Sequence, residues 1–370
     1  MSGVELSHIL GNWMAELANT PQNPQWHAEG DVLRHTQMVC QALESLDAYR
    51  NADETTQTIL YLAAALHDIG KAAVTRQEDG NWVSPGHSRK SAEMARPSLW
   101  LDFCLCGTPE KQRLREAVCL LIRYHSVPAY AVSHPDGVRL LRRIAANGQQ
   151  VPGFCLDWLC TLAQADARGR ICQDQQEFEE RVLLCRELAQ EAGCLNGPYP
   201  FPSRHTARAY LSGKEIHPEY ELYDTTWGEV ILLSGLPGTG KDTWIQQHCP
   251  RLPMVSLDVI RKEQGISPQD NQSKVLDLAR EQARELLRQK RSFVWNATNL
   301  TPQTQQSQVQ LFESYGAAVR IVYLETAWQE QLRRNANREA AVPETVISHM
   351  LEKLSPPEAW EADHVIWQCV

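Results

Sequence analysis

The stretch EVILLSGLPGTGKDT, residues 229–243, decides the fold of the second half of this chain. Its continuous apolar run is typical of a buried parallel strand, and it leads directly into a glycine-rich turn that ends in Lys241. Glycines let backbone N–H groups and the next helix N-terminus face a phosphate, while the lysine reaches the β- and γ-phosphates. This order predicts an NTP-binding P-loop. The residues predicted to hold the nucleotide are Gly235, Gly238, Thr239, Gly240, Lys241, Asp242 and Thr243.

The residue after the lysine departs from the usual pattern. Most P-loops place Ser or Thr there to hold Mg²⁺, whereas this chain has Asp242. We expect Thr243 to supply the hydroxyl instead, because Asp242 would bring a negative charge close to the triphosphate. The cofactor expected for this half is therefore ATP or another NTP with Mg²⁺.

Three further apolar runs follow the P-loop, at residues 252–258, 292–299 and 317–325. They lack alternation and are separated by helical segments such as residues 273–290. This pattern is typical of a buried parallel sheet in an α/β domain.

Charged residues near the P-loop suit a phosphotransferase. We expect Asp258, at the end of the second strand, to orient an acceptor hydroxyl and take its proton, and Arg261 to hold a phosphate on the acceptor. Arg334 and Arg338 stand four apart ahead of Pro343, so we expect them on one helix face, closing over the triphosphate as a lid. Taken alone, two such arginines also fit a solvated helix face.

The first half has a different pattern. From about residue 31 to residue 193 the apolar spacing is helical almost throughout, which predicts an all-α domain. The segment NGPYPFP at residues 196–202 breaks both helix and strand, although the boundary fits anywhere from residue 195 to residue 225. The predicted divisions are a phosphohydrolase domain at 1–195, a linker at 196–225 and a kinase domain at 226–370.

Histidines and aspartates carry the chemistry of the helical half. His67 and Asp68 lie side by side in ALHDIGK at the end of an apolar helix. Adjacent helical residues diverge by about 100°, so a metal here needs ligands from other helices. Imidazole and carboxylate ligands suit divalent transition metals, which favours phosphoester hydrolysis. A lone helical histidine is otherwise a core or surface residue. The further candidate ligands are His35, His87, His125 and Asp166.

The order His35, His67 with Asp68, then Asp166 resembles the HD phosphohydrolase superfamily over about residues 25–175. The resemblance implies that His87 and His125 match the extra histidines of two-metal HD proteins. We expect the helical half to bind one or two divalent transition metals, such as Mn²⁺, Co²⁺, Ni²⁺ or Zn²⁺. The residues it implies for contact with the substrate or its phosphate are Lys71, Arg168, Arg170 and His27. A solvated-surface role fits the two arginines equally, and His27 also fits a structural role.

The second half resembles the polynucleotide kinase branch of P-loop phosphotransferases. That resemblance implies that Asp258 is the general base, that Arg261 binds the acceptor's phosphate, and that the paired lid arginines serve the donor. In this order the whole chain is similar to the bacterial HD-Pnk end-healing enzymes. The similarity implies removal of 3′-phosphate or 2′,3′-cyclic phosphate and phosphorylation of 5′-OH ends of broken RNA or DNA, before sealing by a separate ligase.

Two other functions fit the residues. The kinase half would also suit a small hydroxylated substrate, and the helical half would also suit a nucleotide-sensing module that has lost catalysis. The net charge of −9, from 36 Lys and Arg against 45 Asp and Glu, favours the small substrate mildly. It excludes a global positive field, so nucleic acid must bind a local basic patch.

Length and composition set the remaining expectations. A chain of 370 residues fits two domains, and 43% hydrophobic residues exclude wholesale disorder. The eleven cysteines form no C-x-x-C pair and are predicted to be buried free thiols. With no secretion signal and no long apolar run, we expect a cytoplasmic protein without a membrane partner. The sequence leaves the oligomeric state open.

Overall fold

The computed structural model describes residues 6–267, 270–338 and 340–370. The chain divides into two compact units, residues 1–105 with 110–200, and residues 106–109 with 201–370. The segment predicted as a linker contains helix α12 (Arg204–Leu211). Arg208 of this helix pairs with Glu313 of the second unit at 2.8 Å. Residues 201–225 therefore belong to the second unit.

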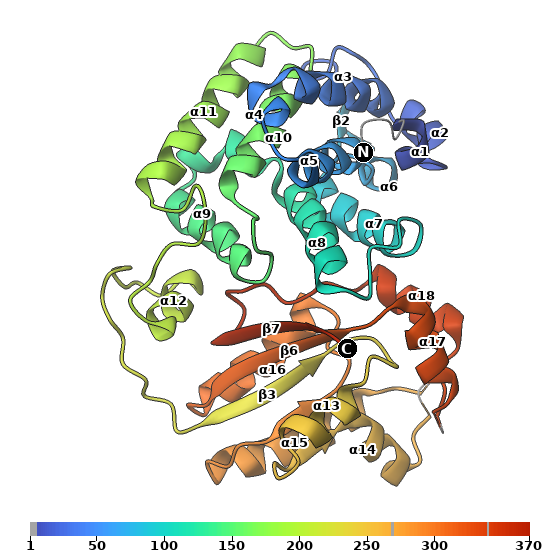
Figure 1. Cartoon of the computed structure of the whole chain (residues 1–370), viewed down its shortest axis with the longest axis vertical. Helices are drawn as coiled ribbons and strands as arrows, with labels where there is room; N and C mark the ends of the chain where they lie inside the picture. Colours follow the sequence, from blue (N-terminus) through green and yellow to red (C-terminus); the bar gives the residue numbers. More distant parts are fainter. Residues whose placement is uncertain (1–5, 268–269, 339) are drawn as a thin grey trace. The chain divides into compact units, whose positions relative to one another are not determined.

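The first unit is built of helices, as predicted (Figure 1). The helices are α1 (Leu6–Leu10), α2 (Trp13–Ala18), α3 (Val32–Ser45), α4 (Asp47–Arg50), α5 (Glu54–Leu66), α6 (Lys71–Val74), α7 (His87–Leu101), α8 (Pro109–Tyr124), α9 (Gly137–Ala146), α10 (Leu156–Arg168) and α11 (Gln175–Glu191). A short antiparallel hairpin of β1 (Arg76–Glu78) and β2 (Asn81–Val83) was not predicted. Its strands are too short and too exposed to show a hydrophobic pattern.

Local sequence explains where the two central helices begin. Asp31 caps α3 by accepting from the backbone N–H of Arg34, and Asp53 caps α5 by accepting from Thr55 and Thr56. Helix α10 packs against both α3 and α5, which share an apolar core (Figure 1). Helix α5 ends at Leu66, so the chain turns just where the histidine and aspartate pair begins.

A buried ionic cluster joins α7 to α8. Arg96 donates to both carboxylate oxygens of Glu116, and Arg115 donates to the same carboxylate at 2.7 Å. All three residues are less than 9% exposed, and the Arg115 guanidinium lies 3.9 Å from the Trp100 ring centroid. The charges of Arg96 and Arg115 overcome the effect of burial and hold the pKa of Glu116 below its usual range. The Glu116 carboxylate therefore balances positive charge from both arginines.

Replacing Glu116 with Gln should therefore destabilise the first unit strongly. The change removes the negative charge that both buried guanidinium groups contact, which costs about 3–5 kcal/mol of unfolding free energy. Denaturant unfolding followed by circular dichroism measures the loss. Glu93→Gln, which breaks an exposed pair with Arg89, is the control and should cost about 0–1 kcal/mol. Equal small losses in both variants would contradict this account.

The second unit is an α/β domain with one five-stranded sheet in which every neighbouring pair is parallel. The strands, in spatial order, are β4 (Met254–Ser256), β5 (Val294–Asn296), β3 (Glu229–Ser234), β6 (Ala318–Glu325) and β7 (His364–Cys369). The helices after α12 are α13 (Lys241–His248), α14 (Leu257–Gln264), α15 (Ser273–Arg288), α16 (Pro302–Ser314), α17 (Trp328–Ala336) and α18 (Glu344–Glu352).

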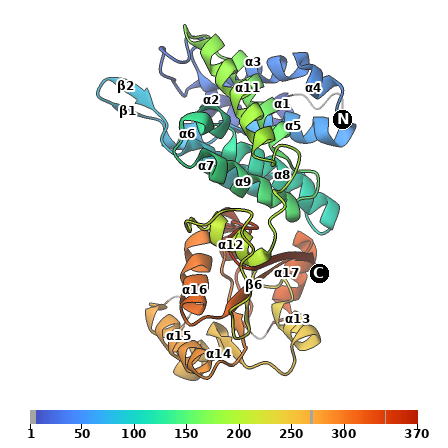
Figure 2. The ribbon, with the colours of Figure 1, turned by 90° about the vertical axis from the view of Figure 1, so that its left-hand side faces the viewer.

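Helices cover both faces of this sheet (Figure 2). One face packs alternate residues such as Val230 and Leu232 against α14, α15 and α16. The other face packs Ile231 and Leu233 against Trp244 and neighbouring residues of α13. Because β3 is central and buried on both faces, its carboxyl end delivers the glycine-rich loop to the middle of the sheet edge.

Two further expectations concern thiols and membranes. All eleven cysteines are free, as predicted, but not all are buried, since Cys104 is exposed. Within the described ranges, no helix is both long enough and apolar enough to cross a membrane.

Candidate active sites

Four helix ends and one helix surface bring the predicted metal ligands of the first unit together. His35 lies on α3, His67 and Asp68 directly follow α5, and His87 begins α7. His125 directly follows α8, and Asp166 lies in the last turn of α10. Around the Asp68 carboxylate, Oδ2 lies 3.2 Å from His67 Nε2 and 3.7 Å from His35 Nε2, while Oδ1 lies 3.4 Å from His87 Nε2 and 3.9 Å from His125 Nε2. Each carboxylate oxygen of Asp68 thus lies near two imidazoles.

The backbone fixes the orientation of three of these imidazoles. His67 Nδ1 lies 2.8 Å from the Ala64 carbonyl oxygen, and His125 Nδ1 lies 2.7 Å from that of Ile122. His87 makes the same contact with Ser84 at 2.8 Å. A carbonyl oxygen can only accept, so each Nδ1 carries a proton, and in the neutral form of each ring Nε2 keeps a lone pair. This is the tautomer that binds a metal through Nε2.

Buried polar atoms without partners indicate that the cluster fits metal ions. Among the described residues, His35 Nε2, His67 Nε2, Asp68 Oδ1 and Asp166 Oδ1 have no hydrogen-bond partner although they are buried. Two triads, His35 with His67 and Asp68, and Asp68 with His87 and His125, each place their ligand atoms within 4.8 Å of one another. Burying such atoms unpaired is costly, and divalent cations would satisfy them.

The charges of the cluster also suit cations. Burial would raise the pKa of Asp68, but the charges of His67 and Lys71 outweigh it and hold that pKa well below its usual value. Asp166 keeps a low pKa against burial because of Arg170 and His35. Burial, reinforced by the neighbouring histidines, lowers the pKa of His125 to about 3. The aspartates are therefore anionic and His125 is neutral at neutral pH, as metal ligation requires.

Close approach of α10 to α3 places Asp166 beside His35. The two side chains lie 3.1 Å apart, Asp166 Oδ1 to His35 Nε2. A Cβ on Gly169 would lie 2.6–2.7 Å from Val39 atoms of α3, so only glycine permits this packing. Arg170 pairs with Asp166 Oδ2 at 2.6 Å, whereas Arg168 pairs with Glu179 on α11. The structure thus brings Arg170 to the cluster but not Arg168.

Gln22 and Glu29 also lie at this site and were missed by sequence reasoning. Lys71 Nζ lies 2.7 Å from Asp68 Oδ2 and donates to the side-chain carbonyl of Gln22. Glu29 is buried and lies between His27 and His35, 2.8 Å and 2.9 Å from their Nδ1 atoms. Neither residue belongs to a periodic pattern, because both lie on the loop before α3, whose path only tertiary packing determines.

In the second unit, the glycine-rich loop follows β3 and leads into α13, as predicted. Gly238 has φ +85°, and a Cβ there would lie 2.7 Å from the Gln331 carbonyl oxygen, so glycine is required. Lys241 donates from Nζ to the carbonyl oxygens of Gly235 and Leu236, each at 2.9 Å. Burial, with a smaller contribution from Arg338, lowers the pKa of Lys241 to about 8. A bound phosphate would supply a direct anionic partner for the lysine.

Asp258 lies in the first turn of α14, which corrects the expectation that it ends the second strand. Strand β4 stops at Ser256 because that side chain caps α14, accepting from the Val259 N–H. The Asp258 carboxylate pairs with Arg261 one turn later and lies 3.4 Å from Arg338. The expected base, Asp258, therefore lies between Arg261, expected to bind the acceptor, and Arg338, one of the expected lid arginines.

The lid arginines do not share one helix face, so that prediction was wrong for Arg338. Helix α17 ends at Ala336, because the Asn335 side chain bonds both the N–H and the carbonyl of Val342 and turns the chain back. Arg334 remains on α17, pairs with Glu330, and comes within 3.4 Å of where a Cβ on Gly240 would lie. Arg334 thus lies beside the P-loop and Arg338 beside Asp258.

The two residues after the P-loop lysine differ in their contacts. Asp242 accepts a hydrogen bond of 2.7 Å from Asn296 at the end of β5. The side chain of Thr243 is exposed, and in the described part of the chain its hydroxyl has no hydrogen bond. The hydroxyl is available to a ligand, and its role in holding Mg²⁺ stays a prediction.

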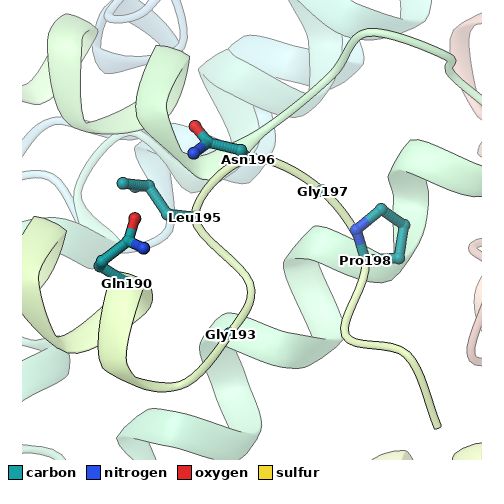
Figure 3. Close-up of a pocket in the computed structure, with 6 residues that line it drawn as sticks. All are labelled: Gln190, Gly193, Leu195, Asn196, Gly197 and Pro198. Carbon is teal, nitrogen blue, oxygen red and sulfur yellow. The ribbon is translucent and has the colours of Figure 1, made fainter.

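A hollow elsewhere in the first unit holds no comparable chemistry. It is lined by Gln190, Gly193, Leu195, Asn196, Gly197 and Pro198, at and after the end of α11 (Figure 3). None of these side chains is charged or a usual metal ligand, so the histidine and aspartate cluster is the better candidate for catalysis.

Comparisons with known proteins match both halves. Residues 32–144 match the family model of the HD domain, and residues 230–357 match a family model described as an AAA domain. Human heterogeneous nuclear ribonucleoprotein U-like protein 2 is 28% identical over 148 residues, 35% of this chain and 20% of that protein, and the mouse protein matches equally. The chain therefore spans about a fifth of these curated relatives. The structure of a proposed kinase from Chloroflexus aurantiacus covers 39% of this chain and 86% of its own, at 13% identity and TM-score 0.33.

Proposed function

We propose that this chain, which joins an HD phosphohydrolase domain to a P-loop kinase-like domain, heals the ends of broken RNA. The observation that carries the proposal is the presence in one chain of a histidine and aspartate cluster suited to metal-dependent hydrolysis and a P-loop suited to phosphate transfer. One site is suited to removing phosphate, and the other is suited to adding it.

In the first unit, six side chains would hold two divalent metal ions. They are His35, His67, Asp68, His87, His125 and Asp166. Such ions activate water and neutralise phosphate charge. The protein's own part is to bind the 3′-phosphate or 2′,3′-cyclic phosphate. Lys71 and Arg170 supply positive charge at the cluster, and His27 lies beside His35 with ring centroids 4.7 Å apart.

In the second unit, the side chains suit transfer of the γ-phosphate from ATP to a 5′-hydroxyl. Lys241 and Arg334 would hold the phosphates of the nucleotide, while Arg261 would hold a phosphate of the acceptor. Asp258 would accept the proton of the 5′-OH as its oxygen bonds to the γ-phosphorus and ADP leaves. Phosphates of the bound nucleotide would compete with Asp258 for Arg338 and release the carboxylate to act as base.

RNA is the favoured substrate for two reasons. The curated relatives that match the chain are named as ribonucleoproteins. Arg261 and Arg338 also place positive charge beside Asp258 on a protein whose net charge is −9. After both reactions the ends would be ready for a separate ligase.

The test is end-labelling with ATP that carries a labelled γ-phosphate. A 5′-OH RNA oligonucleotide should become labelled in the presence of Mg²⁺. Asp258→Asn should lower turnover by about 10²-fold or more, because the general base is lost. Asp277→Asn, an exposed aspartate on α15, is the matched control and should retain turnover.

The same experiment distinguishes the alternative function. Oligonucleotides that stay unlabelled while a small hydroxylated metabolite is phosphorylated would identify a small-molecule kinase. Normal turnover of Asp258→Asn would show that another group is the base.

A further inference from the structure

We infer that Glu29 is a positioning residue of the histidine and aspartate cluster. Glu29 holds His35 in the orientation and tautomer that bind metal. This inference rests on the metal-dependent phosphoesterase proposed above. Glu29 is 5% exposed, and its side chain is fully buried. A carboxylate in that environment needs specific partners, and the structure provides three of them.

The two carboxylate oxygens of Glu29 have different partners. Oε1 lies 2.8 Å from His27 Nδ1 and 2.9 Å from His35 Nδ1. Oε2 accepts the backbone N–H of Ile171 at 2.8 Å. The contact with His35 is short enough for a hydrogen bond but not aligned as one, and among the residues that the structure describes the Nε2 atom of that ring also has no hydrogen-bond partner.

The position of Glu29 also links two metal ligands through the backbone. Ala28 donates its N–H to the Ile171 carbonyl oxygen at 2.8 Å, so residues 28 and 29 make hydrogen bonds to both the carbonyl and the N–H of Ile171. Ile171 directly follows Arg170, the residue that pairs with Asp166. Glu29 therefore holds His35 directly and fixes the chain that orients Asp166.

His35 differs from the other histidines of the cluster in its Nδ1 partner. His67, His87 and His125 use backbone carbonyls, whereas His35 faces a carboxylate. An Nδ1–H that faces a carboxylate makes Nε2 a stronger electron donor and fixes the ring, and loss of such partners typically weakens metal binding 10–100-fold.

Glu29→Gln is the sharpest test. An amide has one oxygen, so its NH₂ must face either the two Nδ1–H groups or the Ile171 N–H, and one set of contacts is lost in either rotamer. The affinity of the full-length protein for Co²⁺ alone, by titration calorimetry, should fall about 10–100-fold. The visible absorption of the bound Co²⁺ should also change, because the His35 ligand is reoriented.

Glu179→Gln is the matched control. It removes a carboxylate that pairs with Arg168 near the end of α10 but does not contact the cluster. Its Co²⁺ affinity and spectrum should equal those of the wild type. If Glu29→Gln does not fold by circular dichroism, Glu29→Asp replaces it, since it retains both oxygens but shortens their reach, and should weaken Co²⁺ binding by about 3-fold or more.

Wild-type Co²⁺ affinity and an unchanged Co²⁺ spectrum in a folded Glu29 variant would overturn the inference. Because the readout is metal alone, this result is independent of whether RNA ends are the substrate. A failure of the proposed function would appear instead as a wild-type protein that binds Co²⁺ and leaves 3′-phosphate ends intact.

Discussion

Asp68→Ala should abolish metal binding and phosphate removal together. Asp68 faces imidazoles with both oxygens and pairs with Lys71 at 2.7 Å, so its loss removes the anion on which the cluster converges. Phosphate release from a 3′-phosphate oligonucleotide should fall about 10³-fold or more, since metal ions contribute several kcal/mol to such reactions. Metal content by elemental analysis should fall in parallel.

Glu179→Gln is the control for this variant too, because it removes a carboxylate from the same unit while leaving the cluster intact. Full phosphatase activity in Asp68→Ala, or in wild-type protein treated with a chelator, would contradict a metal-dependent site.

Lys241→Ala should have the second large effect, on the kinase reaction. Its ammonium donates to two loop carbonyls in the cradle where the phosphates are expected. Removing a charged donor aimed at developing charge typically costs about 10²–10³-fold in turnover. Transfer of labelled phosphate from ATP to a 5′-OH oligonucleotide measures the effect.

Lys274→Ala, an exposed lysine in the first turn of α15, is the matched control and should leave kinase turnover unchanged. Near-normal phosphate transfer by Lys241→Ala would show that this loop does not bind the donor phosphates.

The sequence predicts the parts of the fold and sites that depend on contiguous residues. The P-loop follows from a strand, three glycines and Lys241 within one short stretch, and the structure places them as expected. The helical and α/β halves are predicted for the same reason, because apolar periodicity is local. His67 and Asp68 directly follow an apolar helical run, so their position at a helix end is also predicted by the sequence.

Features that do not show in apolar periodicity were not predicted in this way. Helix α17 stops before Arg338 because the Asn335 side chain bonds the backbone of Val342, and β4 stops before Asp258 because Ser256 caps a helix. Both are local polar contacts, which the apolar pattern does not reveal. Strand β7 has no continuous buried pattern, since its residues are half-buried at a sheet edge. Glu29 lies on a loop, and only the tertiary fold of that loop brings its side chain to the histidine and aspartate cluster.

The central claim is that one chain carries two separate chemistries for the two ends of a break. A single RNA oligonucleotide with a 5′-OH and a 3′-phosphate tests it directly, when mass spectrometry reads both ends after incubation with ATP, Mg²⁺ and Mn²⁺. Wild-type protein should convert both ends. Asp68→Ala should add the 5′-phosphate and keep the 3′-phosphate, and Lys241→Ala should do the reverse. Loss of both reactions in either folded variant would contradict two separate sites, and no change at either end with wild-type protein would contradict end healing itself.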